Sequence, residues 1–158
     1  METSKVTIRL ATKADIPELY RMEQRCFDAE SFSRSQVNYL TMQSPGFFWV
    51  LTEDEKIAGF MVLLQRINSQ ALRIYSLAVS PEFRGKQYAQ QLMQKAVQKA
   101  GELGKDRLYL EVSEHNHGAI QLYQKLGFQL TGIRPRYYRD GSNACLMEKK
   151  VEVLSTKG

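Results

Sequence analysis

Residues 84–89 have the sequence Arg-Gly-Lys-Gln-Tyr-Ala and stand between an apolar run and a strongly amphipathic segment. A strand that leads through a glycine loop into a helix can present backbone N–H groups to a phosphate. Glycine tolerates positive φ, and the helix dipole favours an anion. Arg84 and Lys86 could add positive charge. The loop therefore predicts a site for a phosphate-bearing cofactor, although one short glycine loop is equally compatible with an ordinary strand-to-helix turn.

Glu111 is the carboxylate of the apolar segment Leu-Tyr-Leu-Glu-Val at residues 108–112. In a strand, alternation places Glu111 with Tyr109 on the face opposite to the two leucines and the valine. A carboxylate on a covered sheet face needs a partner or a water-lined cleft, and either setting can raise its pKa toward that of a general base. The alternative is a carboxylate on a solvated edge.

Tyr123 lies on the apolar face of the segment that follows, residues 116–128. It is either a core tyrosine with a satisfied hydroxyl or a phenol at a cleft that protonates a leaving group. His115 and His117 flank Asn116 without a further set of ligands. We therefore expect loop histidines and no metal site.

Hydrophobic periodicity assigns these residues to strands and helices. The expected strands are residues 6–10, 47–51, 57–64, 72–79, 107–112, 128–133 and 144–153, and the expected helices are 16–27, 36–42, 89–103 and a segment that Asn116 caps and Gly127 ends. Thr12 and Asp15 have the spacing of a capping box before the first helix. This order predicts an α/β fold in a single domain over residues 1–158, with one mixed, mostly antiparallel sheet of about six to seven strands and helices on both faces.

The chain has 158 residues, of which 43% are hydrophobic and 25% are charged, as in ordinary globular domains. It has no apolar run of membrane-spanning length and no signal-peptide pattern at its start, so we expect a cytoplasmic protein. Cys26 and Cys145 lack metal-ligand spacing, and we expect them to be reduced packing residues.

The net charge of +5 suits an anionic partner, either a nucleotide-like cofactor or nucleic acid. The densest basic group is residues 134–139, where three arginines surround Tyr137 and Tyr138. Interleaved basic and aromatic residues serve single-stranded nucleic acid in some proteins. One short cluster of this kind favours a solvated loop or the wall of a substrate site instead.

Taken together, these segments resemble the GNAT superfamily of acetyl-CoA-dependent N-acetyltransferases. Residues 84–89 are similar to its pyrophosphate motif, Arg/Gln-x-x-Gly-x-Gly/Ala, and residues 76–81 are similar to its signature strand. Residues 110–128 resemble the motif that follows in the superfamily. Residues 134–147 resemble the RimI-like branch, which acetylates protein N-termini. The resemblance covers nearly the whole chain.

The resemblance implies a role for each candidate residue. Glu111 would be the general base for the acceptor ammonium, and Tyr123 would protonate the CoA thiolate. The residues expected to line the acceptor site are Phe32, Tyr137 and Tyr138. The residues expected to hold acetyl-CoA are Leu77, Ala78, Val79, Arg84, Gly85, Lys86, Gln87, Tyr88, Ala89, Gln90 and Asn116. A neutral amine would attack the thioester directly, without a metal and without a covalent cysteine intermediate.

The chain departs from the family pattern at three places. Gln87 stands where the motif has a glycine, so a positive φ there would be strained, whereas a helical φ would let the side chain point outward. Ser113 follows Leu-Glu-Val where the RimI-like motif usually has arginine, and residues 29–33 lack a Pro-Trp pair often found in the ribosomal-protein acetylase. The last two departures concern the acceptor rather than the fold.

We predict an acetyl-CoA-dependent N-acetyltransferase that acts on a protein or peptide N-terminal α-amine. We expect a monomer or homodimer, with neither a membrane nor nucleic acid as a partner. One alternative keeps the fold and changes the acceptor to a small amine such as a polyamine, an amino acid or an aminoglycoside. The other is a non-catalytic acyl-CoA-binding module, for which Gln87 is the only support.

Overall fold

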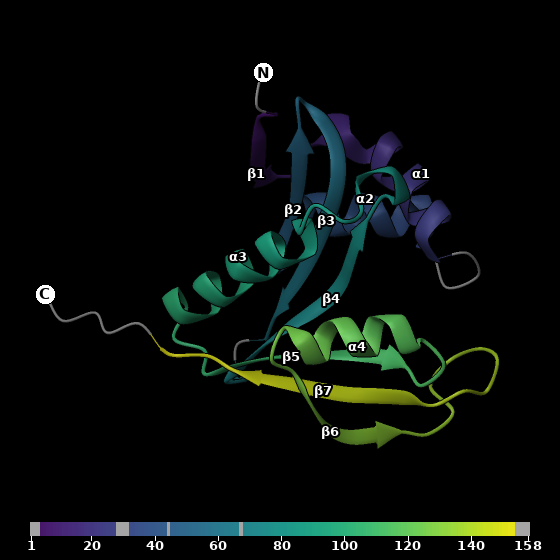
Figure 1. Ribbon diagram of the computed structural model, residues 1–158, viewed down its shortest axis with the longest axis vertical. Coiled ribbons are helices and arrows are strands. Elements are labelled where there is room, and N and C mark those ends of the chain that lie inside the picture. The colour runs from purple at the N-terminus through teal and green to yellow at the C-terminus, as the bar shows by residue number, and fades with distance from the viewer. Residues whose placement is uncertain (1–3, 28–31, 44, 67, 154–158) are drawn as a thin grey trace, which may run out of the picture. The chain divides into compact units, whose positions relative to one another are not determined.

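The computed structural model describes residues 4–27, 32–43, 45–66 and 68–153. The elements, in chain order, are β1 (Val6–Leu10), α1 (Ile16–Phe27), α2 (Arg34–Met42), β2 (Gly46–Glu53), β3 (Lys56–Gln65), β4 (Ala71–Val79), α3 (Tyr88–Glu102), β5 (Arg107–Ser113), α4 (His117–Lys125), β6 (Gln129–Arg134) and β7 (Ala144–Lys150) (Figure 1). Short 3₁₀ turns precede α1 and α3. No helix among the described residues is long and apolar enough to cross a bilayer.

Seven strands form one sheet in the order β1-β2-β3-β4-β5-β7-β6. Among the pairs whose register is described, β4–β5 is parallel, and β1–β2, β2–β3, β5–β7 and β6–β7 are antiparallel. A parallel pair needs a crossover connection, which α3 supplies between β4 and β5. The predicted mixed, mostly antiparallel sheet of six to seven strands is confirmed.

The described residues group into two compact units. The first lies within Met1–Leu64 and Ser76–Gln94, and the second lies within Gln65–Tyr75 and Lys95–Gly158. Strand β4 and helix α3 each contribute residues to both units.

The core of the first unit comes from continuous apolar strands and two amphipathic helices. Strands β2 and β3 pair from Gly46↔Leu64 to Glu53↔Lys56, and most of their side chains are buried. This is the predicted hairpin. The buried apolar residues of α1 and α2 follow helical spacing and are Ile16, Leu19, Met22, Val37 and Leu40.

The core of the second unit is built on the alternation of β5. Leu108, Leu110 and Val112 are buried, whereas Tyr109 and Glu111 lie on the other face, as the sequence predicts. The neighbouring strand β7 was expected to continue to Val153, and it ends at Lys150. Its partner β5 begins at Arg107, which is paired with Lys150, and the last hydrogen bond runs from the Val151 N–H to the Asp106 carbonyl at 2.9 Å. The antiparallel neighbours β5, β7 and β6 lie side by side in Figure 1.

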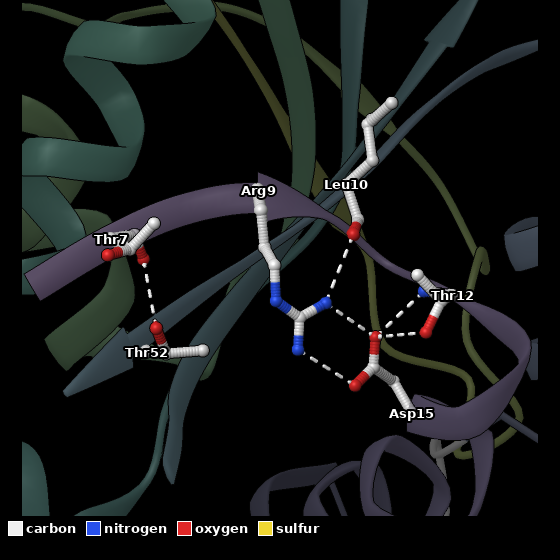
Figure 2. A network of polar contacts seen from close by, with 6 residues as sticks. All are labelled: Thr7, Arg9, Leu10, Thr12, Asp15 and Thr52. Atoms are coloured by element: carbon white, nitrogen blue, oxygen red, sulfur yellow. Dashed lines mark hydrogen bonds and ion pairs between the residues drawn. The ribbon is translucent and has the colours of Figure 1, made fainter. Parts of the chain in front are cut away.

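A polar network fixes the connection between β1 and α1 (Figure 2). The Arg9 guanidinium donates to both oxygens of Asp15, at 2.7 and 3.0 Å. The same carboxylate accepts the backbone N–H of Thr12 at 2.7 Å and its hydroxyl at 3.1 Å. The sequence indicated the Thr12–Asp15 cap but not the arginine. The hydrogen bonds from Arg9 lower the pKa of Asp15, and the bond from Thr12 acts in the same direction.

We expect Asp15→Asn to lower the free energy of unfolding by about 1–2 kcal/mol at neutral pH, because the amide cannot replace a bidentate, charge-assisted pair. The folded pKa of Asp15 lies below its ordinary value, so this stabilisation is present above the unfolded pKa and is lost as the pH falls through the folded one. Urea denaturation at neutral pH and at about pH 3 would show the difference shrinking in acid. Equal losses at both pH values would contradict the interpretation.

The control is Glu18→Gln. Glu18 pairs with Arg21 at 2.8 Å on the exposed side of α1. Loss of a solvent-exposed pair should cost less than about 0.5 kcal/mol.

Candidate functional site

The loop between β4 and α3 has the backbone geometry expected of an anion site. Gly85 has φ +85, and a Cβ built on it would meet no atom within 4 Å. The glycine is therefore required by the backbone conformation and not by lack of space. The Gln91 N–H donates to the Gln87 carbonyl at 3.1 Å as α3 begins. The N–H groups of Tyr88, Ala89 and Gln90 come before this bond, so they are left for a ligand or solvent.

Gln87 has φ +63, which places a non-glycine residue in the left-handed region. Of the two conformations that the sequence allowed, the strained one is present. The left-handed conformation costs a residue with a Cβ roughly 1–2 kcal/mol. The side chain of Gln87 is exposed, so little packing offsets this cost.

The charged side chains of the loop already have partners in the first unit. The Arg84 Nε donates to the Val79 carbonyl at 3.1 Å and ties the loop to the end of β4. The Lys86 Nζ lies 2.7 Å from the Glu53 Oε1, and the Tyr88 hydroxyl donates to the same oxygen. These hydrogen bonds lower the pKa of Glu53. Burial, together with the bond to Glu53, raises the pKa of Tyr88 to about 12.

Glu53 was missed in the sequence because it ends a strand far from the loop, and no local motif marks it. Its effect is that the positive charge of Lys86 is partly compensated before any anion binds. The backbone donors of α3 would then carry more of the binding than the sequence suggested.

The carboxylate of Glu111 is buried between two arginines in the second unit. Its side chain is 4% exposed. One oxygen lies 3.3 Å from the Arg73 Nη2, and the other lies 3.0 Å from the Arg134 Nε. The sequence required either a partner or a water-lined cleft for this carboxylate, and the structure supplies two partners.

The strand register explains why these side chains share one face. In the parallel pair Arg73 lies opposite Tyr109, which faces the same way as Glu111. Across β7, Glu111 is opposite Leu146, and Leu146 is opposite Gly132. Arg134 is two residues beyond Gly132 and therefore points to the same face.

Tyr137 and Tyr138 join this cluster. The Arg73 Nη2 donates to the Tyr137 hydroxyl at 3.3 Å, and the two tyrosine rings pack edge to face with centroids 5.0 Å apart. Burial raises the pKa of Tyr137, and its hydrogen bond with Glu111 acts in the same direction. The guanidinium of Arg73 also lies over the ring of Tyr75, 5.0 Å from its centroid. The structure therefore brings two expected acceptor residues together with the expected base.

Tyr123 and Asn116 have structural roles in α4. The ring of Tyr123 packs edge to face against Phe128, with centroids 5.7 Å apart, and burial raises the pKa of Tyr123 to about 12. The Asn116 side chain accepts the Ala119 N–H at 3.1 Å, which is the predicted helix cap. Expected contacts of these two residues with a cofactor stay predictions.

Phe32 lies in the first unit, just before α2, and residues 28–31 are outside the described part of the chain. The Phe32 N–H donates to the Glu23 Oε1 at 3.2 Å. Burial raises the pKa of Glu23 to about 7, and its second oxygen is buried without a hydrogen-bond partner among the described residues. Glu23 was not singled out in the sequence because it follows the apolar spacing of α1.

The sequence profile of the acetyltransferase (GNAT) family matches residues 16–128. The chain belongs to this family. The ribosomal protein bS18-alanine N-acetyltransferase of Salmonella typhimurium is 29% identical to it over 133 residues, which cover 84% of this chain and 86% of that protein. The predicted family and enzyme class are confirmed.

Two solved structures are similar to this acetyltransferase along nearly its whole length. The ribosomal-protein-S18-alanine N-acetyltransferase from Escherichia coli has a TM-score of 0.82 at 25% identity and covers 98% of this chain and 99% of its own. Ard1 from Thermoplasma volcanium has a TM-score of 0.84 at 31% identity and covers 92% of this chain and 97% of its own. The predicted GNAT fold is confirmed.

We expect Gln87→Gly in this acetyltransferase to raise the free energy of unfolding by about 0.5–1 kcal/mol. Glycine removes the left-handed strain, and the gain is partly offset by the greater freedom of glycine in the unfolded chain. The matched control is Gln94→Gly, at an exposed position inside α3 where the same change should lower stability by about 1 kcal/mol. Urea denaturation of both variants shows whether each change raises or lowers the free energy of unfolding. A loss of stability in both would show that φ at Gln87 carries no strain.

Proposed function

We propose that this enzyme transfers the acetyl group of acetyl-CoA to the α-amine of a protein or peptide N-terminus. The observation that carries the proposal is the buried Glu111 carboxylate, held between Arg73 and Arg134 beside Tyr137. The names of the relatives from Salmonella typhimurium and Escherichia coli, which describe alanine N-acetyltransferases, support this acceptor. Cytoplasmic location and a monomeric or dimeric state stay predictions.

The loop before α3 fits the phosphates of acetyl-CoA. It combines positive φ at Gly85 and Gln87 with helix-start N–H groups, and no acidic residue lies in the first turn of α3. When bound, the cofactor supplies an acetyl group activated as a thioester. The residues proposed to hold it are Leu77, Ala78 and Val79 through their backbone, Arg84, Gly85, Lys86, Gln87, Tyr88, Ala89 and Gln90 around the phosphates, and Asn116.

Glu111 is the proposed general base. An α-amine has a pKa of about 8, so at neutral pH most of it is protonated and cannot attack a carbonyl. The ionised form of a carboxylate is the form that accepts a proton. Glu111 would take the ammonium proton directly or through one water molecule.

Tyr123 is the proposed acid. With a pKa of about 12, its phenol keeps its proton throughout the neutral range. It would donate that proton to the sulfur as the thioester bond breaks, and thus prevent a free thiolate from accumulating. Phe32, Tyr137 and Tyr138 are the proposed walls of the acceptor site.

The alternative acceptors differ in charge. A polyamine would bring several positive charges to a cluster in which two guanidiniums already face one carboxylate, and like charges repel. The cluster therefore favours a peptide α-amine over a polyamine. The non-catalytic alternative keeps the strained Gln87 as its only support, while both proposed proton-transfer residues are present.

Incubation with acetyl-CoA and a mixed panel of N-terminal peptides, lysine peptides and polyamines tests the acceptor. We expect thiol release with the peptides, and mass spectrometry should locate the acetyl group on the α-amine. Acetyl on polyamines alone would overturn the proposal. Tight CoA binding without transfer to any amine would favour the non-catalytic alternative.

We expect Glu111→Gln to reduce turnover about 10²–10³-fold and to leave acetyl-CoA affinity unchanged, because an amide cannot accept the ammonium proton. Steady-state kinetics and calorimetric titration with CoA separate the two effects. The control is Glu148→Gln, on β7 opposite Tyr109, where the carboxylate pairs with Arg107 at 3.5 Å. Unchanged turnover in Glu111→Gln would remove Glu111 from the role of base.

A further inference from the structure

The charges around Glu111 do not balance. Arg73 and Arg134 both face this one carboxylate, at 3.3 and 3.0 Å. The nearby Tyr137 adds no negative charge, because a tyrosine hydroxyl keeps its proton at neutral pH. At neutral pH these four side chains carry a net charge of about +1. A protonated amine that approaches them is repelled unless it brings a negative charge with it.

Arg134 has N–H donors that Glu111 does not use. Its Nε faces Glu111, and its two terminal nitrogens make no hydrogen bond with a described residue. Its side chain is 56% exposed, so these nitrogens are accessible from solution. A guanidinium presents its N–H groups as a planar fork that matches a carboxylate, which makes arginine the preferred partner for such a group.

Arg73 is also incompletely paired. Its Nη2 is shared between the Glu111 Oε2 and the Tyr137 hydroxyl, both at 3.3 Å. Its Nε is buried and has no hydrogen-bond partner among the described residues. Buried polar groups are normally satisfied, so the charge of Arg73 is less fully compensated than that of most buried arginines.

The acidic side chains near the segment that follows Arg134 already accept hydrogen bonds. Asp140 accepts the Ser142 N–H at 2.9 Å, and Glu114 accepts the Asn143 amide at 3.1 Å. Arg136 and Arg139 are exposed, and neither forms an ion pair within the described part of the chain. The two acids offset the charges of Arg136 and Arg139, so the excess positive charge of the cluster comes from Arg73 and Arg134.

We propose that the acceptor is an acidic N-terminus, with an aspartate or glutamate as its first or second residue, whose carboxylate binds Arg134 while its α-amine faces Glu111. This inference rests on the proposed function as an α-amine acetyltransferase. The terminal nitrogens of Arg134 lie close to Glu111, because its Nε is 3.0 Å from that carboxylate. One residue of extended chain spans about 3.5 Å, so a carboxylate on either of the first two residues reaches this fork when the amine is beside the base.

The test compares peptides that differ only in charge. The pairs are Asp-Ala against Asn-Ala and Ala-Glu against Ala-Gln at the N-terminus, on one common peptide sequence. For the wild-type enzyme we expect kcat/KM to be at least about 10-fold higher for the acidic member of a pair, since a good charge-assisted pair contributes more than a neutral hydrogen bond. The preference should decrease as ionic strength rises.

The informative readout for Arg134→Ala is the ratio of kcat/KM between acidic and amide peptides. This change also removes one ion pair from Glu111, so turnover is expected to fall for every peptide. A purely structural role would lower both members of a pair equally and leave the ratio unchanged. We expect the ratio to fall to about 1 in Arg134→Ala and to be partly retained in Arg134→Lys, which keeps the charge but not the fork. Arg139→Ala, which removes an exposed charge that does not contact Glu111, should keep the ratio within about 2-fold.

The outcomes separate this inference from the proposed function. Equal acetylation of acidic and amide peptides would overturn the inference and leave the proposed function standing. A ratio that is unchanged in Arg134→Ala would overturn the role of Arg134. Acetylation of free aspartate or glutamate, but of no peptide, would overturn the peptide acceptor. If no amine in the panel is acetylated, the proposed function fails and this inference fails with it.

Discussion

The buried carboxylate of Glu111 depends on arginines that come from other strands of the sheet. An unpaired carboxylate with this little exposure would be too costly, so the positions of Arg73 and Arg134 are a condition for having Glu111 at all. A β-bulge in β6 meets this condition for Arg134. Leu130 is opposite Met147 and Gly132 is opposite Leu146, so one extra residue lies between them. If Thr131 instead took the place opposite Leu146, without a bulge, Arg134 would shift by one place along β7 and its side chain would point away from Glu111.

Local patterns in the sequence were sufficient to predict the helices and strands, and to predict which side chains share a face of a single strand. Alternation along β5 placed Glu111 opposite its leucines, and Asn116 was identified as a helix cap. Contacts between strands that are far apart in the chain could not be predicted in this way, because they depend on register. Gly132 inside a predicted strand was a signal for the bulge, since an isolated strand glycine often marks one. Nothing local pointed to Glu53 beside Lys86, and only the backbone angle could decide between the two conformations considered for Gln87.

The two proposed halves of the site handle charge in different ways. In the cofactor loop, Glu53 holds Lys86 and the hydroxyl of Tyr88, so backbone N–H groups and the dipole of α3 are the main attraction for phosphate. Around Glu111 the excess charge belongs to side chains and is positive. Backbone N–H groups carry no net charge. They suit the phosphates of acetyl-CoA, which are the same whatever the acceptor. Arginine side chains can discriminate between acceptors, which differ from one another in charge.

The arginines also constrain how Glu111 can act as a base. When the carboxylate accepts a proton, the guanidiniums of Arg73 and Arg134 lose the counter-charge that they face. An acceptor that brings its own carboxylate to Arg134 supplies a replacement counter-charge at the moment when Glu111 becomes neutral. Recognition of an acidic acceptor would then be coupled to proton removal from its amine. The carboxylate that binds Arg134 would also balance the positive charge that remains when Glu111 becomes neutral. An acceptor without a carboxylate would leave both guanidiniums without a replacement counter-charge.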